Sequence, residues 1–338
     1  MTRETVLANI RRSRPVAMGA SALAVLLLSV AATPAAASPT AKAGVADGTL
    51  SIAGGPRADQ IALRLSALDP NQLQVDLGDD GSAEFTFDLG TFRVIEVAAG
   101  NGDDTVRIDQ VNGAFTTTLA TRIDGGNGDD TLIGGSGAEV FSGGNGDDFV
   151  DGNGGPDTAF LGRGDDVFVW DPGDASDIVE GGRGSDTMVF NGAAGNEVLT
   201  ASAEGGRVLF TRNVGNIVMD LDDVEVIDVR ALGGTDTVTI NDVGGTDLER
   251  VDVDLAAALG GSTGDGQADT VTVAATKGDD SIAVDANGGA AEVSGLAAFV
   301  RITHADPTSD TLVIDTDAGV DDVVLDPALD GLILVGVL

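Results

Sequence analysis

The sequence predicts an all-β fold in which short strands stack into a parallel β-solenoid, and three observations support this. A nine-residue unit rich in glycine and aspartate recurs without interruption from residue 125. The residues after each Gly/Asp segment alternate between apolar and polar, as at Val106 and Ile108, which is typical of a half-buried strand. Helical periodicity is almost absent beyond residue 37, and its best candidate, 253–259, is short.

The repeated unit keeps one internal plan. The successive units GGNGDDTLI, GGSGAEVFS, GGNGDDFVD, GNGGPDTAF and LGRGDDVFV start at 125, 134, 143, 152 and 161, followed by WDPGDASDIVE at 170 and GGRGSDTMV at 181. Each has glycine near the front, an acid at the sixth place of a nine-residue unit, and an apolar residue at or beside the eighth. Glycine allows the tight turns, and one such strand buries so little that neighbouring turns must stack. We expect Phe141, Phe160 and Phe168 in the resulting core.

Looser copies of the unit extend the array in both directions. Residues 85–109 align without a gap on 217–241, and related segments begin at Ala58, Asp280, Asp310 and Asp321. Residues 73–87 are expected to form a hairpin around Asp79-Asp80-Gly81. The predicted organisation is a signal peptide over 1–37, a linker over 38–46, an N-terminal β-repeat region over 47–124, the regular repeats over 125–190 and a degenerate β-repeat region over 191–338.

The first 37 residues have the plan of a secretory signal. Four arginines precede an apolar segment over 16–30, which is too short for a stable membrane span. Ala35-Ala36-Ala37 then offers an A-x-A cleavage site. Arg11-Arg12 leaves the twin-arginine route open beside the general secretory route. We therefore expect a secreted or cell-surface protein with no membrane span after cleavage.

The charge of the chain indicates cations as partners. The formal net charge is -37, which disfavours nucleic acid and anionic membrane surfaces. The chain has no cysteine, so disulfides, thiolate metal sites and thiol nucleophiles are excluded. Stacking brings acidic loops close together, and facing carboxylates repel unless a cation lies between them. Oxygen-only ligands suit Ca²⁺ better than zinc or copper.

The units GGNGDDTLI, GGNGDDFVD and GGRGSDTMV resemble the G-G-x-G-x-D-x-U-x repeat of the RTX (repeats-in-toxin) family, which binds Ca²⁺. The resemblance is specific over 125–189 and weaker over 47–124 and 192–326. It implies a right-handed parallel β-roll, flanked by the degenerate segments, with two nonapeptides in each turn. It also implies that each Ca²⁺ lies between loops one turn apart, bound by sixth-position aspartates and loop carbonyls.

That geometry sorts the candidate ligands onto two edges. The first edge would carry Asp130, Asp148, Asp166 and Asp186, together with the loop residues Gly126, Asn127, Gly128, Gly144, Asn145, Gly146, Gly162, Gly164, Gly182 and Gly184. The second edge would carry Glu139, Asp157 and Asp177. Departures from the motif, such as Pro156, concentrate on the second edge. We expect about three ions on the first edge and poorer or empty positions on the second.

Several acids outside the regular repeats are left less defined. Asp104, in AGNGDD, is a further candidate ligand whose edge the sequence leaves open. For Asp236, Asp280, Asp310 and Asp322 we favour plain solenoid corners, because their loops lack the second glycine or the paired acids. An EF-hand at 76–87 is excluded, since Gly78 takes the third position and Phe87 the twelfth.

An enzymatic alternative rests on two residues. Gly260–Gly264 fits G-x-S-x-G around Ser262, and His304 follows in the chain order of α/β-hydrolases. However, GDGQADT follows where a nucleophile elbow needs a helix, and a single histidine excludes H-E-x-x-H. We expect a non-catalytic, calcium-binding structural or adhesive protein that meets an extracellular surface, glycan or protein partner. The alternative is a secreted hydrolase using Ser262 and His304, with the repeats as scaffold.

Overall fold

The computed structural model describes residues 41–338, which build two sheets of 14 strands each. The expected signal peptide over 1–37 lies outside these residues. Within 41–338 no helix is long and apolar enough to cross a membrane. The helical elements of this range are three short 3-10 turns, η1 (Leu89–Thr91), η2 (Val214–Asn216) and η3 (Pro327–Leu329). The predicted all-β class is therefore confirmed.

The strands of the first sheet, sheet A, follow one another in a fixed spatial order. They are β1 (Lys42–Ala46), β2 (Thr49–Ala53), β6 (Val94–Asn101), β8 (Ala120–Asn127), β10 (Glu139–Asn145), β12 (Thr158–Arg163), β14 (Ile178–Arg183), β18 (Ile217–Asp222), β17 (Arg207–Arg212), β16 (Val198–Glu204), β20 (Thr237–Ile240), β22 (Thr270–Ala274), β26 (Thr311–Asp315) and β28 (Leu334–Val337).

Sheet B runs alongside in the same sense. From the N-terminal end its strands are β5 (Phe85–Asp88), β4 (Gln72–Leu77), β3 (Gln60–Leu65), β7 (Thr105–Asp109), β9 (Thr131–Ile133), β11 (Phe149–Asp151), β13 (Val167–Trp170), β15 (Thr187–Asn191), β19 (Val226–Arg230), β21 (Arg250–Asp254), β25 (Phe299–Thr303), β24 (Ala290–Ser294), β23 (Ser281–Asn287) and β27 (Asp322–Leu325).

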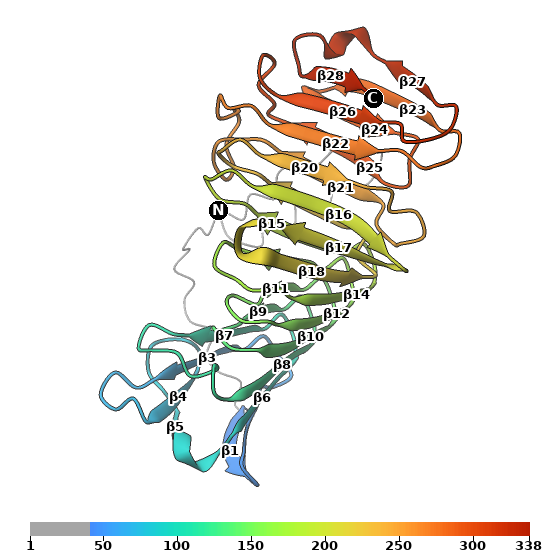
Figure 1. Cartoon of the computed structure of the whole chain (residues 1–338). Helices are drawn as coiled ribbons and strands as arrows, with labels where there is room; N and C mark the ends of the chain where they lie inside the picture. The colour runs from blue at the N-terminus through green and yellow to red at the C-terminus, as the bar shows by residue number, and fades with distance from the viewer. Residues whose placement is uncertain (1–40) are drawn as a thin grey trace. The chain divides into compact units, whose positions relative to one another are not determined.

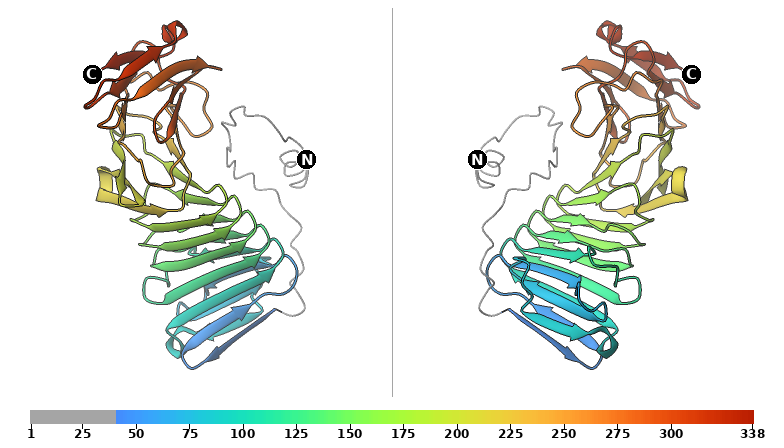
Figure 2. Two further views of the ribbon diagram at one scale, coloured as in Figure 1. Left: turned by 90° about the vertical axis from the view of Figure 1, so that its right-hand side faces the viewer. Right: turned by 90° about the vertical axis from the view of Figure 1, so that its left-hand side faces the viewer.

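The chain passes from one sheet to the other with nearly every strand. Between β6 and β15 each strand of sheet A is followed by one of sheet B, and neighbours within a sheet are parallel. Val140 pairs with Thr158 and Val150 with Phe168, so one turn takes two nonapeptides. The stacked turns are visible in Figures 1 and 2. This is the parallel solenoid that the repeat predicts.

Beyond β15, two antiparallel meanders interrupt the alternation. After β15 the chain reaches β16 and then returns through β17 to β18, which pairs with β14. In sheet B, β23 and β24 lead back in the same way to β25, which pairs with β21. Both meanders lie in the region expected to be degenerate, and they add strands without breaking either sheet. The nine-residue rhythm is lost where these extra strands occur.

Local expectations are partly confirmed. The hairpin over 73–87 is present, since Leu73 of β4 pairs antiparallel with Phe87 of β5. The best candidate for helical periodicity, 253–259, forms no helix, since Val253 and Asp254 end β21 and 255–259 are irregular. Within the expected linker over 38–46, residues 42–46 form β1 and pair with β2. Both sheets also run through the expected boundaries at 124 and 190, so these mark changes in sequence regularity.

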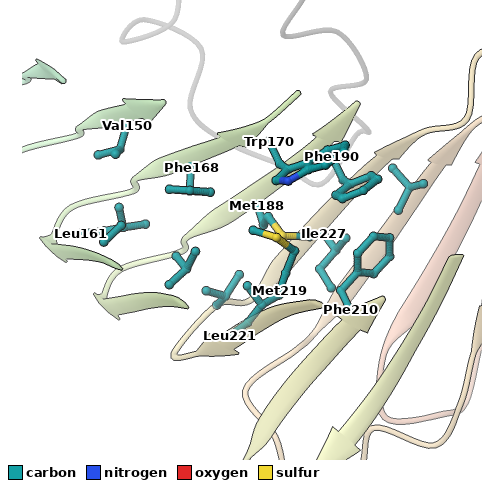
Figure 3. Packing of buried hydrophobic residues seen from close by; sticks show 14 of the residues in the cluster. Val150, Leu161, Phe168, Trp170, Met188, Phe190, Phe210, Met219, Leu221 and Ile227 are labelled. Atoms are coloured by element: carbon teal, nitrogen blue, oxygen red, sulfur yellow. The ribbon is translucent and has the colours of Figure 1, made fainter. Parts of the chain in front are cut away.

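Apolar side chains fill the space between the two sheets. The eighth residues of the units are all buried: Leu132, Phe141, Val150, Ala159, Phe168 and Met188. Figure 3 shows this core continuing into the first meander through Phe210, Met219 and Leu221. In sheet B the Trp170 ring stacks on Phe190 with centroids 4.2 Å apart. Phe160, which we expected in the core, is 49% exposed. It occupies a ninth position, and alternation along the strand points it outward.

The stacked glycines predict a strong dependence on side-chain size. Gly144 has φ +116°, and a Cβ there would lie 2.2 Å from the carbonyl oxygen of Gly126 in the turn below. Gly144→Ala should lower the free energy of unfolding in Ca²⁺ by more than about 1 kcal/mol, measured by urea denaturation. Gly206→Ala is the control, because a Cβ there has nothing within 4 Å. Equal stability of the two variants would contradict the close approach.

Candidate functional site

A column of buried carboxylates runs along the corners where the chain passes from sheet A to sheet B. The backbone N–H of each residue donates to a carboxylate oxygen one turn further on: Asp104 to Asp130 at 2.7 Å, Asp130 to Asp148 at 2.8 Å, Asp148 to Asp166 at 2.7 Å and Asp166 to Asp186 at 2.9 Å. We call these five residues the first-edge column. Their common edge is as predicted, and Asp104 also lies on it.

Three of the five first-edge loops open with a glycine, Gly125, Gly143 or Gly181, that leaves room beside the column aspartate. A Cβ on Gly143 would lie 2.5 Å from Oδ2 of Asp148 in its own loop and 2.4 Å from the carbonyl oxygen of Leu161 in the next turn. A carboxylate oxygen and a carbonyl oxygen therefore approach the same small volume. The side chains of Asn127 and Asn145 are engaged elsewhere, since Nδ2 of Asn145 donates to Oδ1 of Asn127 at 2.9 Å.

A second column occupies the opposite corners. The N–H of Glu139 donates to Oδ1 of Asp157 at 2.7 Å, and the N–H of Asp157 donates to Oδ1 of Asp177 at 2.8 Å. We call Glu139, Asp157 and Asp177 the second-edge column. The longer side chain of Glu139 folds back within its own loop, where Oε2 accepts the N–H of Gly135 at 2.7 Å. The predicted division into two edges is therefore present in the structure.

Most column carboxylates have one oxygen without a donor. In each such residue the other oxygen accepts a backbone N–H, and the remaining oxygen is buried without a hydrogen-bond partner. This holds for Asp104, Asp130, Asp148, Asp166, Asp186, Glu139 and Asp157. A buried carboxylate is costly unless it is paired or bound to a metal ion. The oxygen-only composition and the convergence of carbonyls fit Ca²⁺, whose preferred ligands they are.

Burial raises the pKa of the column carboxyls. Desolvation is the largest cause and raises the pKa of Asp148 to about 8 and that of Asp157 to about 9. The neighbouring carboxylates of each column add to the effect, while the backbone N–H bonds oppose it. Asp130 and Asp166 rise to a pKa of about 6 for the same leading reason. A cation beside these oxygens would favour their ionised forms.

The sequence reasoning missed a second row of acids beside the first-edge column. Fifth-position residues form their own ladder, in which the N–H groups of Asp129, Asp147 and Asp165 donate to Asp103, Asp129 and Asp147 at 3.0–3.1 Å. We call these four aspartates the surface row, because three of them are exposed. The doublet in GGNGDD could have revealed it. The second edge has Ala138, Pro156 and Ser176 at the equivalent positions, so the first edge is more acidic.

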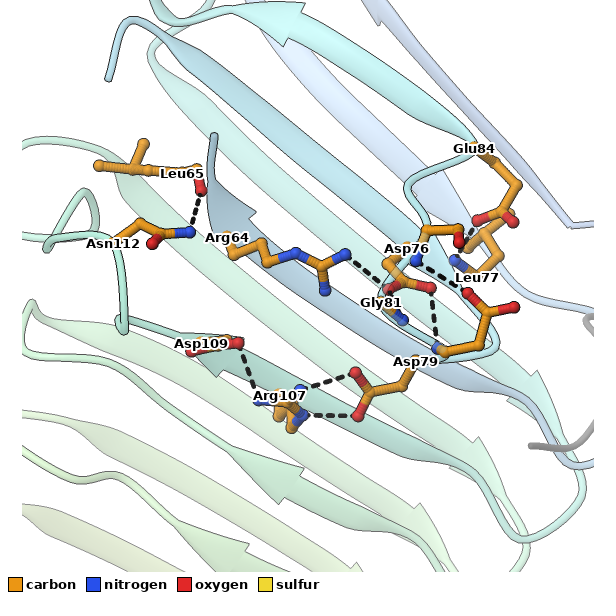
Figure 4. A network of polar contacts seen from close by, with 12 residues as sticks. Arg64, Leu65, Asp76, Leu77, Asp79, Gly81, Glu84, Arg107, Asp109 and Asn112 are labelled. Atoms are coloured by element: carbon orange, nitrogen blue, oxygen red, sulfur yellow. Dashed lines mark hydrogen bonds and ion pairs between the residues drawn. The ribbon is translucent and has the colours of Figure 1, made fainter. Parts of the chain in front are cut away.

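Some acids outside the columns pair with arginines of the protein itself. Asp76 is fully buried, and Nη2 of Arg64 donates to its Oδ2 at 2.7 Å (Figure 4). Asp79 takes two bonds of 2.6 Å from Arg107. The stretch that superficially resembles an EF-hand is therefore held by arginines within the N-terminal strands.

The loops that we expected to be solenoid corners without an ion differ in how their aspartates are hydrogen-bonded. Asp280 accepts two bonds from Thr276, and Asp310 accepts the N–H of Asp306 at 2.6 Å, so both have local donors. Asp322 is misplaced by the sequence reasoning. It begins β27, and Asp321 takes the corner by accepting the N–H of Asp280 at 2.8 Å.

Asp236 differs from Asp280 and Asp310, because no donor in the protein reaches one of its carboxylate oxygens. Its Oδ2 is buried without a donor.

The two residues of the hydrolase alternative lie in separate loops. Ser262 is in an exposed connection between β21 and β22, and a strand rather than a helix follows it. His304 has φ +57° at the corner after β25, and its Nδ1 lies 2.6 Å from Oδ1 of Asp254. Among the described residues, the strand–turn–helix of a nucleophile elbow is absent around Ser262.

Comparison with known families agrees with this geometry. The RTX calcium-binding nonapeptide repeat matches residues 116–150, 142–169 and 172–204. Residues 116–204 therefore carry RTX-type calcium-binding repeats. The matched stretch holds most of both columns, whereas Asp104 precedes it and Asp236 follows it.

Comparison with whole proteins adds little. The sequence matches no curated protein. One solved structure with some similarity is the extracellular lipase LipA from Serratia marcescens, at 12% identity and a TM-score of 0.17. The alignment covers 60% of this RTX chain and 40% of the lipase, so the chain spans less than half of that protein.

The raised pKa values predict an unusual pH dependence in EDTA. A carboxyl whose pKa is higher in the folded state binds protons more tightly there than in the unfolded chain. Stability should therefore be greatest near pH 4 and fall as the pH rises through the first-edge values of about 6 to 8. Urea unfolding at pH 5 and pH 8 measures this. Greater stability at pH 8 in EDTA would contradict the burial of uncompensated carboxylates.

Proposed function

We propose that the chain is a secreted, non-catalytic protein in which Ca²⁺ binding completes the folding of the RTX region and gives it an extracellular structural or adhesive role. The observation that carries this proposal is the buried carboxylate oxygen without a donor, repeated at successive turns of the first-edge column. The family match supports the choice of ion.

Electrostatics explains why folding should depend on the ion. The backbone N–H bonds fix one oxygen of each column carboxylate but leave its charge uncompensated in a poorly solvated corner. Successive carboxylates also repel one another along the column. Bound Ca²⁺ would supply positive charge between adjacent turns. Because a set of aligned loops does not exist in the unfolded chain, free energy of binding would become free energy of folding.

Different residues of each loop would have different roles in binding the ion. Sixth-position aspartates such as Asp148 face the interior corner, and the first glycines admit a carbonyl from the next turn. The surface row raises the negative potential along the same edge, which would attract cations without holding them in a buried place. Five residues in the first-edge column leave four intervals, one more than the sequence reasoning allowed.

The expected signal peptide supports an extracellular setting. Outside the cell, Ca²⁺ is abundant enough to fill sites of the affinity found in extracellular modules, about 10⁻⁴–10⁻³ M. Inside the cell, the RTX region would remain incompletely folded until export. This favours the general secretory route over a route for folded proteins.

Neighbouring aspartates in one loop provide a matched test of the buried column. Asp148→Asn removes a buried column carboxylate, and Asp147→Asn removes the adjacent surface-row carboxylate. We expect Asp148→Asn to raise the Ca²⁺ midpoint of folding about tenfold, which corresponds to about 1.4 kcal/mol. Asp147→Asn should raise it only a few-fold, and high salt should reduce that effect.

The single tryptophan provides the readout. Trp170 is fully buried, and its Nε1 donates to the carbonyl of Ala175 at 2.8 Å, so its emission should change as the repeats close. Full-length chain is depleted with EDTA and titrated with Ca²⁺ while fluorescence and far-UV circular dichroism are recorded. Equal shifts for the two variants, or a full β signal in EDTA, would contradict the proposal.

The difference between the edges gives a separate prediction. Asp157→Asn should raise the Ca²⁺ midpoint less than Asp148→Asn does, because the second edge has fewer acids and Pro156 lacks an N–H. The two variants are titrated side by side at low and high salt. A larger effect at Asp157 would mean that the second edge holds the tighter ions, and would reverse the predicted order.

A further inference from the structure

One carboxylate outside both columns shares their defining feature. Among residues 41–338, the buried carboxylate oxygens without a donor belong to seven column residues and to Asp236. Asp236 is 1% exposed and follows the matched RTX stretch. Its loop, ALGGTD over 231–236, begins with Ala-Leu where GGNGDD begins with two glycines.

The backbone of this loop nevertheless follows a nonapeptide. Leu232 and Gly234, its second and fourth residues, have φ +67° and +131°. In the second-edge loop 152–157, Asn153 and Gly155 take the same two positions with φ +55° and +111°. A left-handed leucine is unfavourable by itself, so the surrounding structure must hold it there. The segment 231–239 is thus a nonapeptide in conformation, although its sequence hides it.

Asp236 also belongs to a ladder of its own. The N–H of Glu197 donates to its Oδ1 at 2.8 Å, and its own N–H donates to Oδ1 of Asp269 at 2.7 Å. In the same pair of loops the N–H of Gly234 donates to Oδ2 of Asp265 at 2.8 Å. Burial raises the pKa of Asp236 to about 7, and the charges of Asp269, Glu197 and Asp265 add to this.

In two other residues of this ladder, donors within the protein reach both carboxylate oxygens. Glu197 is fully paired, because buried Arg212 bonds to its Oε1 and the N–H of Ala193 donates to its Oε2. At the far end, Asp310 accepts N–H groups with both oxygens, from Asp269 and from Asp306. Asp236 alone in this ladder keeps a buried oxygen without a partner.

We propose that Asp236 and Asp269 hold a divalent cation between the loops 231–236 and 264–269, with Ca²⁺ as the ion their oxygen ligands suit. The site lies outside the repeats on which the proposed function rests, so either can fail without the other. It extends ion binding beyond the first meander into the region that the sequence marks as degenerate.

The test counts bound ions on the full-length chain. Equilibrium dialysis against Ca²⁺ is performed on the natural sequence, on Asp236→Asn and on Asp310→Asn. We expect Asp236→Asn to bind one Ca²⁺ fewer per chain, and Asp310→Asn, whose carboxylate is satisfied internally, to bind the same number as the natural chain. An unchanged count for Asp236→Asn overturns the site. Absence of Ca²⁺ from every protein would instead overturn the proposed function.

A second measurement needs no variant and guards against misfolding. Hydrogen exchange of the natural chain is followed at the amides of 232–237 in EDTA and in Ca²⁺. Slower exchange at Gly234 and Asp236 in Ca²⁺, at concentrations above those that fill the RTX repeats, supports the site. Equal exchange in both conditions overturns it. For folded Asp236→Asn, the unfolding temperature in EDTA should be unchanged or higher, since a buried unpaired carboxylate has been removed.

Discussion

A buried carboxylate recurs at each turn of the first edge, and one of its oxygens has no donor in the protein. This constraint follows from the architecture. Each turn offers the carboxylate one backbone N–H from the turn below, as Asp130 offers its N–H to Asp148. The second oxygen of Asp148 faces a glycine and a carbonyl. Stacking more turns strengthens the apolar core, but it also adds like charges along the same line.

Buried acids outside the first edge are satisfied within the protein in different ways. At the N-terminal end Arg64 neutralises Asp76, and in the first meander Arg212 pairs with Glu197 while lying 5.2 Å from the centre of the Trp170 ring. Towards the C-terminus, Asp310 is satisfied by backbone N–H groups. In the first-edge column, from Asp104 to Asp186, one oxygen of each carboxylate has no such donor. Calcium dependence should accordingly be strongest between residues 104 and 186.

The regular period made the two edges predictable, but irregular connections concealed the rest. Two units per turn place Asp130 and Asp148 on one edge whatever the details of packing. The link between β7 and β8 has no such period, so the edge of Asp104 had to come from strand pairing. Leu232 concealed a nonapeptide loop, because a sequence pattern does not reveal a left-handed leucine. The meanders were also hidden, since nothing in β16 specifies that it pairs with β20 rather than β14.

The central claim is that ions lie in the buried columns rather than along the surface row. Anomalous diffraction from crystals grown with Ca²⁺, or with Tb³⁺ in its place, locates the ions directly. The account predicts anomalous peaks between successive first-edge carboxylates, including one between Asp104 and Asp130. Peaks confined to the surface row of Asp103, Asp129, Asp147 and Asp165, with none in the column, would contradict it.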